Sequence, residues 1–255
     1  MGMSFGLLHL PHFLSHRKSP NSPPTKINNM NVLVIPDLHA PCMHPKAIAF
    51  LKHIEKKYNC NKVVAVGDLV DHSAISFHEK DPSMPSASEE FALAMKQVKQ
   101  VHKAFPKVEF LIGNHDALPA RKARVIGLPD ECIYNFKDLW QLDGWKVHPR
   151  YAKIYVDGVQ YRHGDSGKGG LMAAHRNAQA EFCSVVQGHL HSQAGVVYHA
   201  NEQSIVFGMQ VGCLVVHDHP AMAYGKVYSN KPILGAGVVL NGKTAIFEPM
   251  NLGSK

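Results

Sequence analysis

Short polar clusters follow the apolar runs of this chain, and that arrangement constrains its fold more than any other feature. The segment Asn31–Ile35 carries a continuous apolar run, as expected for a strand buried on both faces. Similar runs occur at Val63–Val66 and Val108–Ile112, and a polar cluster begins directly after each of them. The chain is therefore expected to place polar side chains along one edge of a buried sheet.

Amphipathic helices are expected between these strands. Apolar residues recur at helical spacing from Ala47 to Tyr58 and from Phe91 to Phe105, and Ser88 is the expected cap of the second helix. The resulting β-α-β-α-β order favours parallel strands joined by right-handed crossovers. The predicted fold class is therefore α/β, and periodicity alone does not distinguish a doubly wound sheet from two packed sheets.

The second half of the chain is richer in predicted strands. Ala152–Val156 and Val159–Tyr161 flank Asp157-Gly158, which is typical of a hairpin turn. A helix is expected at Gly169–Gln179. The other predicted strands are Ser184–Gln187, Gly195–Tyr198, Ser204–Phe207, Val211–Val216, Ala236–Leu240 and Thr244–Phe247, with Asn241-Gly242 as the turn between the last two.

One domain, residues 31–252, is expected to follow an N-terminal appendage, residues 1–30. His16–Lys26 is polar and rich in proline, which is typical of extended or disordered chain. The five cysteines are odd in number and include no C-x-x-C pair, which fits a reducing compartment. No apolar stretch approaches the about 20 residues that a membrane span requires, so we expect a cytoplasmic protein without membrane contact.

Five polar clusters consist of residue types that bind metals, and each follows a predicted strand. Ligands of open α/β sheets bind beyond the carboxyl ends of the strands, so these clusters are expected to converge. They are Asp37-Leu38-His39, Gly67-Asp68-Leu69-Val70-Asp71, Gly113-Asn114-His115-Asp116, His163-Gly164-Asp165 and Gly188-His189-Leu190-His191.

The residue types in these clusters suit a pair of divalent cations. Asp37 and His39 can reach one cation from an extended turn, and the carboxylate of Asp68 can bridge two cations and offset their repulsion. Asn114 offers a neutral carbonyl oxygen, and the histidines offer imidazoles. Mixed nitrogen and oxygen ligands suit Mn, Fe, Zn, Co or Ni better than calcium, and Mg is also compatible with the oxygen ligands.

Each cluster taken alone has an ordinary structural explanation. Asp37-Leu38-His39 alone fits a helix cap, and Gly67-Asp68 alone fits a turn. A single histidine such as His163 is usually a satisfied polar residue rather than a ligand. It is the combination of five clusters, each after a strand, that indicates a two-metal centre.

These motifs resemble those of the calcineurin-like metallophosphoesterase superfamily. The family pattern is D-x-H, G-D-x-x-D, G-N-H-[DE], a histidine beside glycine, and G-H-x-H, and all five parts occur in order between residues 31 and 191. The resemblance implies a β-sandwich of two mixed sheets flanked by helices, with hydrolysis of phosphate esters as the activity.

The resemblance also implies roles for individual residues. The first metal would be held by Asp37, His39, Asp68 and His191, and the second by Asp68, Asn114, His163 and His189. His115 resembles the family's catalytic histidine on the substrate side, and Asp116 is expected to orient it. Two positions depart from the pattern. His72 follows Asp71 where the family often has arginine, and Arg162 precedes His163, which leaves Asp165 as a competing ligand.

The substrate class is less constrained by the sequence. The net charge of +7 favours an anionic partner. Substrate phosphate could be held by four basic residues, although a solvated basic face also explains the group near residue 121. These residues are Arg121, Arg124, Arg162 and Lys168.

Dense basic stripes with interleaved aromatic residues are absent from the sequence, so extended nucleic-acid binding is not expected. We predict a small phosphomonoester, a nucleotide above all, as the substrate. The compact chain and the loop Phe77–Ser86 are similar to small phage phosphoesterases, which include deoxynucleoside 5′-monophosphatases and would place the protein in a host cytoplasm. Three alternatives remain open: a phosphodiesterase or nuclease, a non-catalytic scaffold, and a metal-stabilised nucleic-acid-binding protein.

Overall fold

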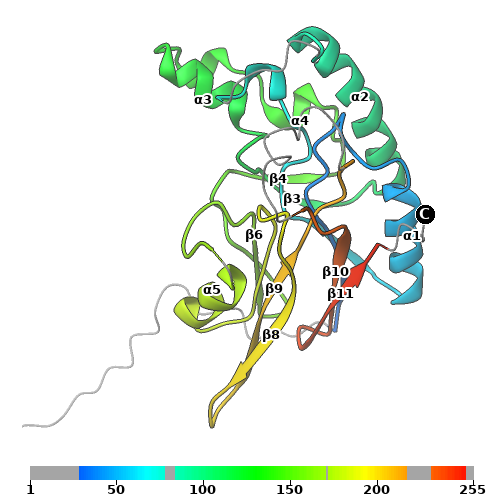
Figure 1. Cartoon of the computed structure of the whole chain (residues 1–255), viewed down its shortest axis with the longest axis vertical. Helices are drawn as coiled ribbons and strands as arrows, with labels where there is room; N and C mark the ends of the chain where they lie inside the picture. Colours follow the sequence, from blue (N-terminus) through cyan, green and yellow to red (C-terminus); the bar gives the residue numbers. More distant parts are fainter. Residues whose placement is uncertain (1–28, 78–83, 171, 217–230, 251–255) are drawn as a thin grey trace, which may run out of the picture.

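Two mixed β-sheets pack face to face in the computed structural model, and helices cover their outer faces (Figure 1). The structure describes residues 29–77, 84–170, 172–216 and 231–250. The predicted fold, two mixed sheets flanked by helices, is confirmed. The N-terminal appendage predicted for residues 1–30 lies outside the described residues except for Asn29 and Met30.

The first sheet has six strands, and its central part is parallel as predicted. β1 pairs with β2, β2 with β3 and β3 with β4 in parallel, whereas β10 and β11 extend the sheet antiparallel on the other side of β1. In spatial order the strands are β11 (Thr244–Pro249), β10 (Gly235–Leu240), β1 (Asn31–Ile35), β2 (Lys62–Ala65), β3 (Glu109–Leu111) and β4 (Lys146–His148).

The second sheet has five strands and a parallel centre. β6 pairs with β7 and β7 with β9 in parallel, and β5 and β8 are antiparallel edge strands. In spatial order they are β5 (Ile154–Val156), β6 (Val159–Arg162), β7 (Val185–Gln187), β9 (Ile205–Val211) and β8 (Ala194–Ala200).

Strand β1 shows why its last four residues, 32–35, are all apolar. Alternate side chains point to opposite faces of a strand. Val32 and Val34 lie in the core between the two sheets, where they join Tyr161 of β6 and Met209 of β9. Leu33 and Ile35 lie in the core between the first sheet and its helices. Both faces are therefore buried from Val32 to Ile35, and the polar Asn31 lies at the half-buried start of the strand.

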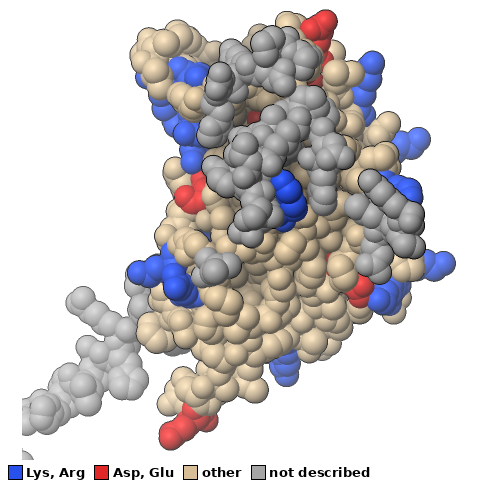
Figure 2. Space-filling view, viewed as in Figure 1, with Lys and Arg blue, Asp and Glu red and all other residues tan. Residues whose placement is uncertain are grey.

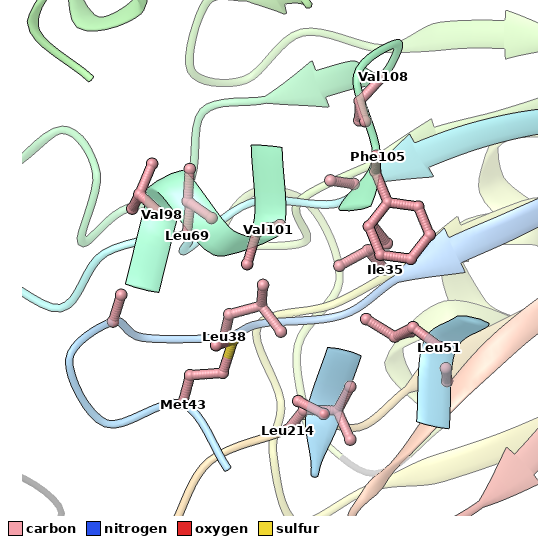
Figure 3. Close-up of a cluster of buried hydrophobic side chains, with 14 of the residues drawn as sticks. Ile35, Leu38, Met43, Leu51, Leu69, Val98, Val101, Phe105, Val108 and Leu214 are labelled. Carbon is pink, nitrogen blue, oxygen red and sulfur yellow. The ribbon is translucent and has the colours of Figure 1, made fainter. Parts of the chain in front are cut away.

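Helices α1 (Ala47–Lys57) and α2 (Ala87–Ala104) cover the first sheet, and Figure 3 shows their packing against it. Helix α5 (Ala173–Glu181) covers β7 and β9 of the second sheet. Two shorter helices, α3 (Leu118–Val125) and α4 (Phe136–Leu139), and two 3₁₀ turns, η1 (Ser73–Ile75) and η2 (Asp130–Cys132), lie between β2 and β4. Among the described helices, none is long and apolar enough to span a membrane.

Several local predictions need correction. Helix α2 is capped by Ser86, not Ser88, because Ser86 and Glu89 form a reciprocal capping box. Helix α5 begins at Ala173 rather than at Gly169. The expected strand Val211–Val216 is not continuous: β9 ends at Val211, and the following residues form isolated bridges to the loop after β1. That segment is apolar because it is buried beside the loop, which periodicity cannot distinguish from a strand.

Candidate metal centre

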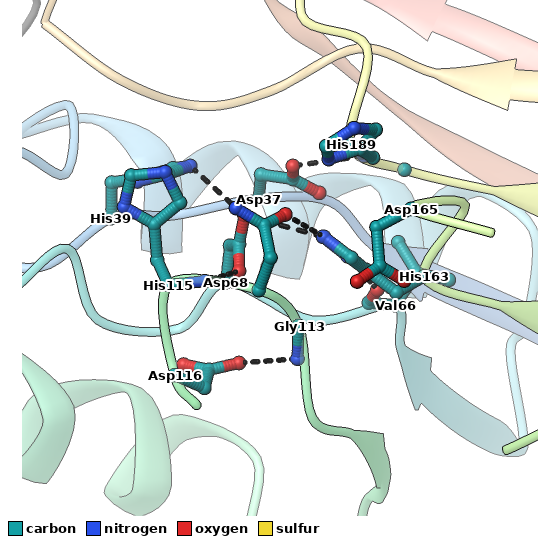
Figure 4. A network of polar contacts seen from close by, with 12 residues as sticks. Asp37, His39, Val66, Asp68, Gly113, His115, Asp116, His163, Asp165 and His189 are labelled. Atoms are coloured by element: carbon teal, nitrogen blue, oxygen red, sulfur yellow. Dashed lines mark hydrogen bonds and ion pairs between the residues drawn. The ribbon is translucent and has the colours of Figure 1, made fainter. Parts of the chain in front are cut away.

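The five polar clusters meet at the carboxyl ends of β1, β2, β3, β6 and β7, as the order of the strands predicts. These strands are parallel to one another within each sheet, and their carboxyl ends face the same edge of the sandwich. Figure 4 shows side chains from separate loops pointing toward one another there.

One group of candidate ligands surrounds the imidazole of His39. Its Nε2 atom lies 3.1 Å from Nε2 of His191 and 3.6 Å from Oδ2 of Asp68. Nε2 of His191 lies 3.1 Å from Oδ2 of Asp37. Asp37, His39 and His191 thus present their ligand atoms to one small volume, as the first ligand set requires.

A second group surrounds the imidazole of His163. Its Nε2 atom lies 2.8 Å from Oδ1 of Asn114 and 3.3 Å from Oδ2 of Asp68. The ring of His189 stands edge-on to His163 at 5.1 Å between centroids. Oδ2 of Asp68 therefore lies between the two groups, within 3.6 Å of an imidazole nitrogen of each.

Three glycines of the motifs are required because each lies against a ligand of another loop. A Cβ atom on Gly113 would lie 2.1 Å from Oδ1 of Asp68, and one on Gly188 would lie 2.3 Å from Oδ1 of Asp37. A Cβ on Gly67 would lie 2.5 Å from Nδ1 of His163. The glycines thus allow the loops to approach closely enough for their ligands to meet.

Three of the candidate ligands have left-handed backbone conformations. His39 and Asp68 have φ of 48°, and His189 has φ of 70°. Such values are uncommon for residues other than glycine and concentrate at functional sites, where the surrounding structure holds them. Hydrogen bonds between loops do so here: the backbone N–H of His39 donates to Asp68 O, and that of His189 donates to Oδ2 of Asp37.

The electrostatics of the site favour cations. Burial opposes protonation of His163, but the charge of Asp68 and a hydrogen bond to it raise the pKa of His163 to about 10. Burial lowers the pKa of His39 and of His189, which keeps these imidazoles neutral and their lone pairs available. Oδ1 of Asp37 is buried and has no hydrogen-bond partner. An excess of carboxylate charge and an unpaired buried oxygen both fit a site for divalent cations.

The carboxylate beside His115 is that of Asp71, which corrects the expectation that Asp116 orients this ring. Nδ1 of His115 lies 2.8 Å from the backbone oxygen of Asp71 and 3.1 Å from its Oδ1 atom. Although burial alone would lower the pKa of His115, the hydrogen bond to Asp71 and the charge of Asp68 raise it to about 9. Sequence reasoning included Asp71 in the second cluster but gave it no role.

Asp116 instead holds two loops together. Its carboxylate accepts hydrogen bonds from the backbone N–H of Val70 at 3.1 Å and of Gly113 at 2.9 Å. Burial and the charge of Asp68 raise its pKa to about 7. Asp116 therefore fixes the distance between the loop after β2 and the loop after β3, which carry Asp68 and Asn114.

The structure shows the surroundings of the two departures from the family pattern, at His163 and at His72. Oδ2 of Asp165 accepts a hydrogen bond from Nε of Arg150 at 2.7 Å, so this carboxylate is paired, whereas His163 contacts Asn114 and Asp68 directly. The geometry thus favours His163 over Asp165 as the ligand. The backbone of His72 is in the left-handed region, and its Nε2 atom is buried without a hydrogen-bond partner. The centroid of its ring lies 5.9 Å from that of Trp140.

The four basic residues predicted to hold substrate differ in their surroundings. Nη1 of Arg121, on α3, lies 3.5 Å from the backbone oxygen of Asn114. Arg124 makes two hydrogen bonds to Asp130 of η2 in solvent. Arg162 is 3% exposed, and its Nη1 atom contacts Glu181 of α5. Lys168 lies exposed in the loop after β6. Of the four, Arg121 has a direct contact with a candidate metal ligand residue.

Comparisons with known proteins agree with the motifs. The family model described as calcineurin-like phosphoesterase matches residues 30–205. No curated protein gives a significant match.

Several solved structures have a similar arrangement of elements. YfcE, a phosphoesterase from E. coli, is 11% identical over 82% of this chain and 87% of its own, with a TM-score of 0.38. The nuclease MPE of Pseudomonas putida is 12% identical over 86% and 87%, with a TM-score of 0.39. Vps29 of Chaetomium thermophilum is 11% identical over 87% and 96%, with a TM-score of 0.42.

Proposed function

The chain belongs to the calcineurin-like phosphoesterase family, and on that premise we propose that it is a dinuclear metal-dependent phosphoesterase. Its substrate in this proposal is a small phosphomonoester, namely a nucleoside or deoxynucleoside 5′-monophosphate. The observation that carries the proposal is the position of Asp68, whose Oδ2 atom lies within 3.6 Å of one imidazole from each ligand group.

Two cations would be held by the two groups described above. Asp37, His39 and His191 would hold the first, Asn114, His163 and His189 would hold the second, and Asp68 would contact both. When bound, such a pair supplies hydroxide near neutral pH and positive charge beside the phosphoryl oxygens. Both imidazoles and carboxylates are present, so Mn, Fe, Zn, Co, Ni and Mg all remain compatible.

His115 would act on the leaving group. Its Nδ1 atom is engaged by Asp71, so Nε2 would be the ring nitrogen that meets the reacting phosphate. The hydrogen bond to Asp71 and the charge of Asp68 raise the pKa of the ring to about 9, which favours the protonated form. That form can neutralise a phosphoryl oxygen and give a proton to the leaving oxygen. Asp71 holds the ring in this orientation through its contacts with Nδ1.

Support for a nucleotide comes from the contact between Phe77, which follows η1, and two basic residues of α3. Phe77 is 53% exposed, and the cations of Arg121 and Lys122 lie 5.1 Å and 3.7 Å from the centre of its ring. An aromatic ring beside two cations suits a base and its phosphate. Figure 2 shows Lys and Arg side chains gathered at the upper left, where Figure 1 places α3. The loop Phe77–Ser86, on which the resemblance to phage phosphoesterases partly rests, lies outside the described residues at positions 78–83.

A phosphate-release screen tests the proposal. The full chain is incubated with nucleoside monophosphates, cyclic nucleotides, a bis-aryl phosphate and DNA, each with Mn, Mg, Zn, Co and Ni. Release of phosphate from nucleoside monophosphates is the expected result. Preferred cleavage of the diesters or of DNA would assign a phosphodiesterase or nuclease instead, and metal binding without any turnover would indicate a scaffold.

Arg121→Ala is expected to raise KM for a nucleoside monophosphate by about 10-fold, because a charge-assisted hydrogen bond contributes about 1.5–3 kcal/mol and 1.4 kcal/mol corresponds to tenfold. Arg124→Ala is the matched control on the same helix, and its KM is expected to change less than twofold because Asp130 already holds this guanidinium. Steady-state kinetics of the two variants decide the matter. Equal effects would argue against a specific role for Arg121.

A further inference from the structure

Three buried amide side chains form a continuous hydrogen-bonded chain behind the candidate metal centre. Asn177 lies on α5, Gln187 ends β7, and Gln210 lies on β9, and their exposed fractions are 2%, 0% and 6%. Nδ2 of Asn177 donates to Oε1 of Gln187 at 2.8 Å. Nε2 of Gln187 donates to Oε1 of Gln210 at 3.1 Å. We call these three side chains the amide relay.

Each end of the amide relay is bound to the backbone of a loop that bears metal ligands. At one end, the N–H of Lys168 donates to Oδ1 of Asn177 at 2.8 Å, and Nδ2 of Asn177 donates back to Lys168 O at 3.2 Å. Lys168 lies in the loop that follows His163. At the other end, Nε2 of Gln210 donates to the carbonyl oxygen of Gly188, immediately before His189.

The backbone groups at the two ends determine the orientation of every amide between them. A backbone N–H can only donate, so Oδ1 of Asn177 must face Lys168. A backbone carbonyl can only accept, so Nε2 of Gln210 must face Gly188. The relay therefore has a single polarity: Asn177 donates to Gln187, Gln187 donates to Gln210, and Gln210 donates to the loop of His189. Reversing Gln187 would break the bonds at both of its ends.

Gly188 is held from both sides by this arrangement. Its N–H donates to the backbone oxygen of His163 at 2.9 Å, while its carbonyl accepts from Gln210. The same glycine cannot move toward the centre, because even a Cβ atom there would lie 2.3 Å from Oδ1 of Asp37. Close packing of α5 on β9 completes the support: a Cβ on Gly208 would lie 2.3 Å from the backbone N of His175.

We propose that the amide relay positions the loops of His163 and His189 relative to each other, so that Asn177, Gln187 and Gln210 are positioning residues for the second ligand group. The inference rests on the proposed function and deepens it. Groups behind metal ligands orient them, and their loss typically lowers metal affinity about 10-fold to 100-fold. Among the described residues, the relay reaches the first ligand group only indirectly. The link is the loop that carries both His189 and His191.

The test compares Gln210→Met with Gln160→Met. Gln160 is also a fully buried glutamine, and it lies on the adjacent part of the same sheet, but it bonds to Tyr155 and the end of α5 rather than to a ligand loop. Binding of Mn²⁺ and Co²⁺ to the full chain is measured by titration calorimetry, and KM and kcat are measured at saturating metal. In Gln210→Met, the second cation is expected to bind about 10-fold to 100-fold more weakly. The first cation is expected to bind as in the wild type, and kcat is expected to recover at saturating metal.

The possible results separate the inference from the proposed function. Wild-type affinity for both cations in Gln210→Met would contradict the proposed role of the amide relay. Equal weakening of cation binding in Gln160→Met would contradict it too. Neither result would contradict the proposed phosphoesterase function. If Gln210→Met does not fold, Asn177→Asp takes its place, since it keeps the acceptor for Lys168 and removes the donor to Gln187. Unchanged binding of the second cation in Asn177→Asp would likewise contradict the proposed role of the amide relay. A wild-type chain that binds no cation pair would refute the proposed function itself.

Discussion

Asp68→Asn is expected to reduce the number of tightly bound divalent cations from two to one and to lower turnover by at least ~1,000-fold. The reason is that Oδ2 of Asp68 is the one described carboxylate oxygen within 3.6 Å of imidazoles from both ligand groups. An amide carries no charge to offset the repulsion of two cations. Losing one cation removes several kcal/mol of transition-state stabilisation, and each 1.36 kcal/mol corresponds to tenfold in rate.

The asparagine variant preserves the fold of the loop. Oδ1 of Asp68 accepts a hydrogen bond from the backbone N–H of His115 at 2.8 Å, and an amide oxygen can accept the same bond. Asp157→Asn is the matched control, because Asp157 is also buried but lies in the β5–β6 hairpin, where it accepts from Met30 N. Metal content by elemental analysis and phosphate-release rates are the measurements. Two tightly bound cations in Asp68→Asn would contradict a bridging role.

His115→Ala is expected to retain both cations and to lose at least ~100-fold in turnover, the scale of one general acid. Its ring is engaged by Asp71 through Nδ1 and belongs to neither of the two ligand groups, although it forms a third cluster of ligand atoms with His39 and Asp71. The loss should appear in kcat rather than in KM, because protonation of the leaving oxygen occurs only as the bond breaks.

Two comparisons sharpen the test of His115. His102→Ala is the control, since His102 lies near the end of α2 and its Nε2 atom contacts the backbone oxygen of Asp143. Substrates with good leaving groups, such as an aryl phosphate with low phenol pKa, should suffer less from His115→Ala than nucleoside monophosphates do. Wild-type turnover of a nucleoside monophosphate by His115→Ala would remove the residue from the chemistry.

Much of the candidate centre could be predicted because it depends on local patterns. The apolar run of β1 requires burial on both faces, and Asp37 and His39 follow directly at its end. Parallel strands bring such ends to one edge, so Asp37 and Asp68 are expected to be neighbours from sequence order alone. The division of the ligands into two groups came only from the family resemblance, and periodicity contains no information about it.

Other features depend on how separate loops dock, and no local pattern reports that. Asp116 is the sequence neighbour of His115, whereas Asp71 lies 44 residues away in the loop after β2, yet Asp71 contacts the ring and Asp116 binds the backbone of Gly113. Likewise, Asn177, Gln187 and Gln210 look like ordinary polar residues of a helix and two strands. They form one chain of hydrogen bonds only because α5 lies directly on β9.

The sequence by itself thus determined the order of elements, the edge at which the ligands gather and the kinds of ligand atom available. Burial, alternation and motif spacing act over a few residues, so they can be read along the chain. Which side chain meets which was decided by the tertiary structure, because a hydrogen bond depends on distances of about 3 Å between atoms that belong to loops far apart in sequence. Those distances are set by the packing of two sheets and a helix, to which the whole domain contributes.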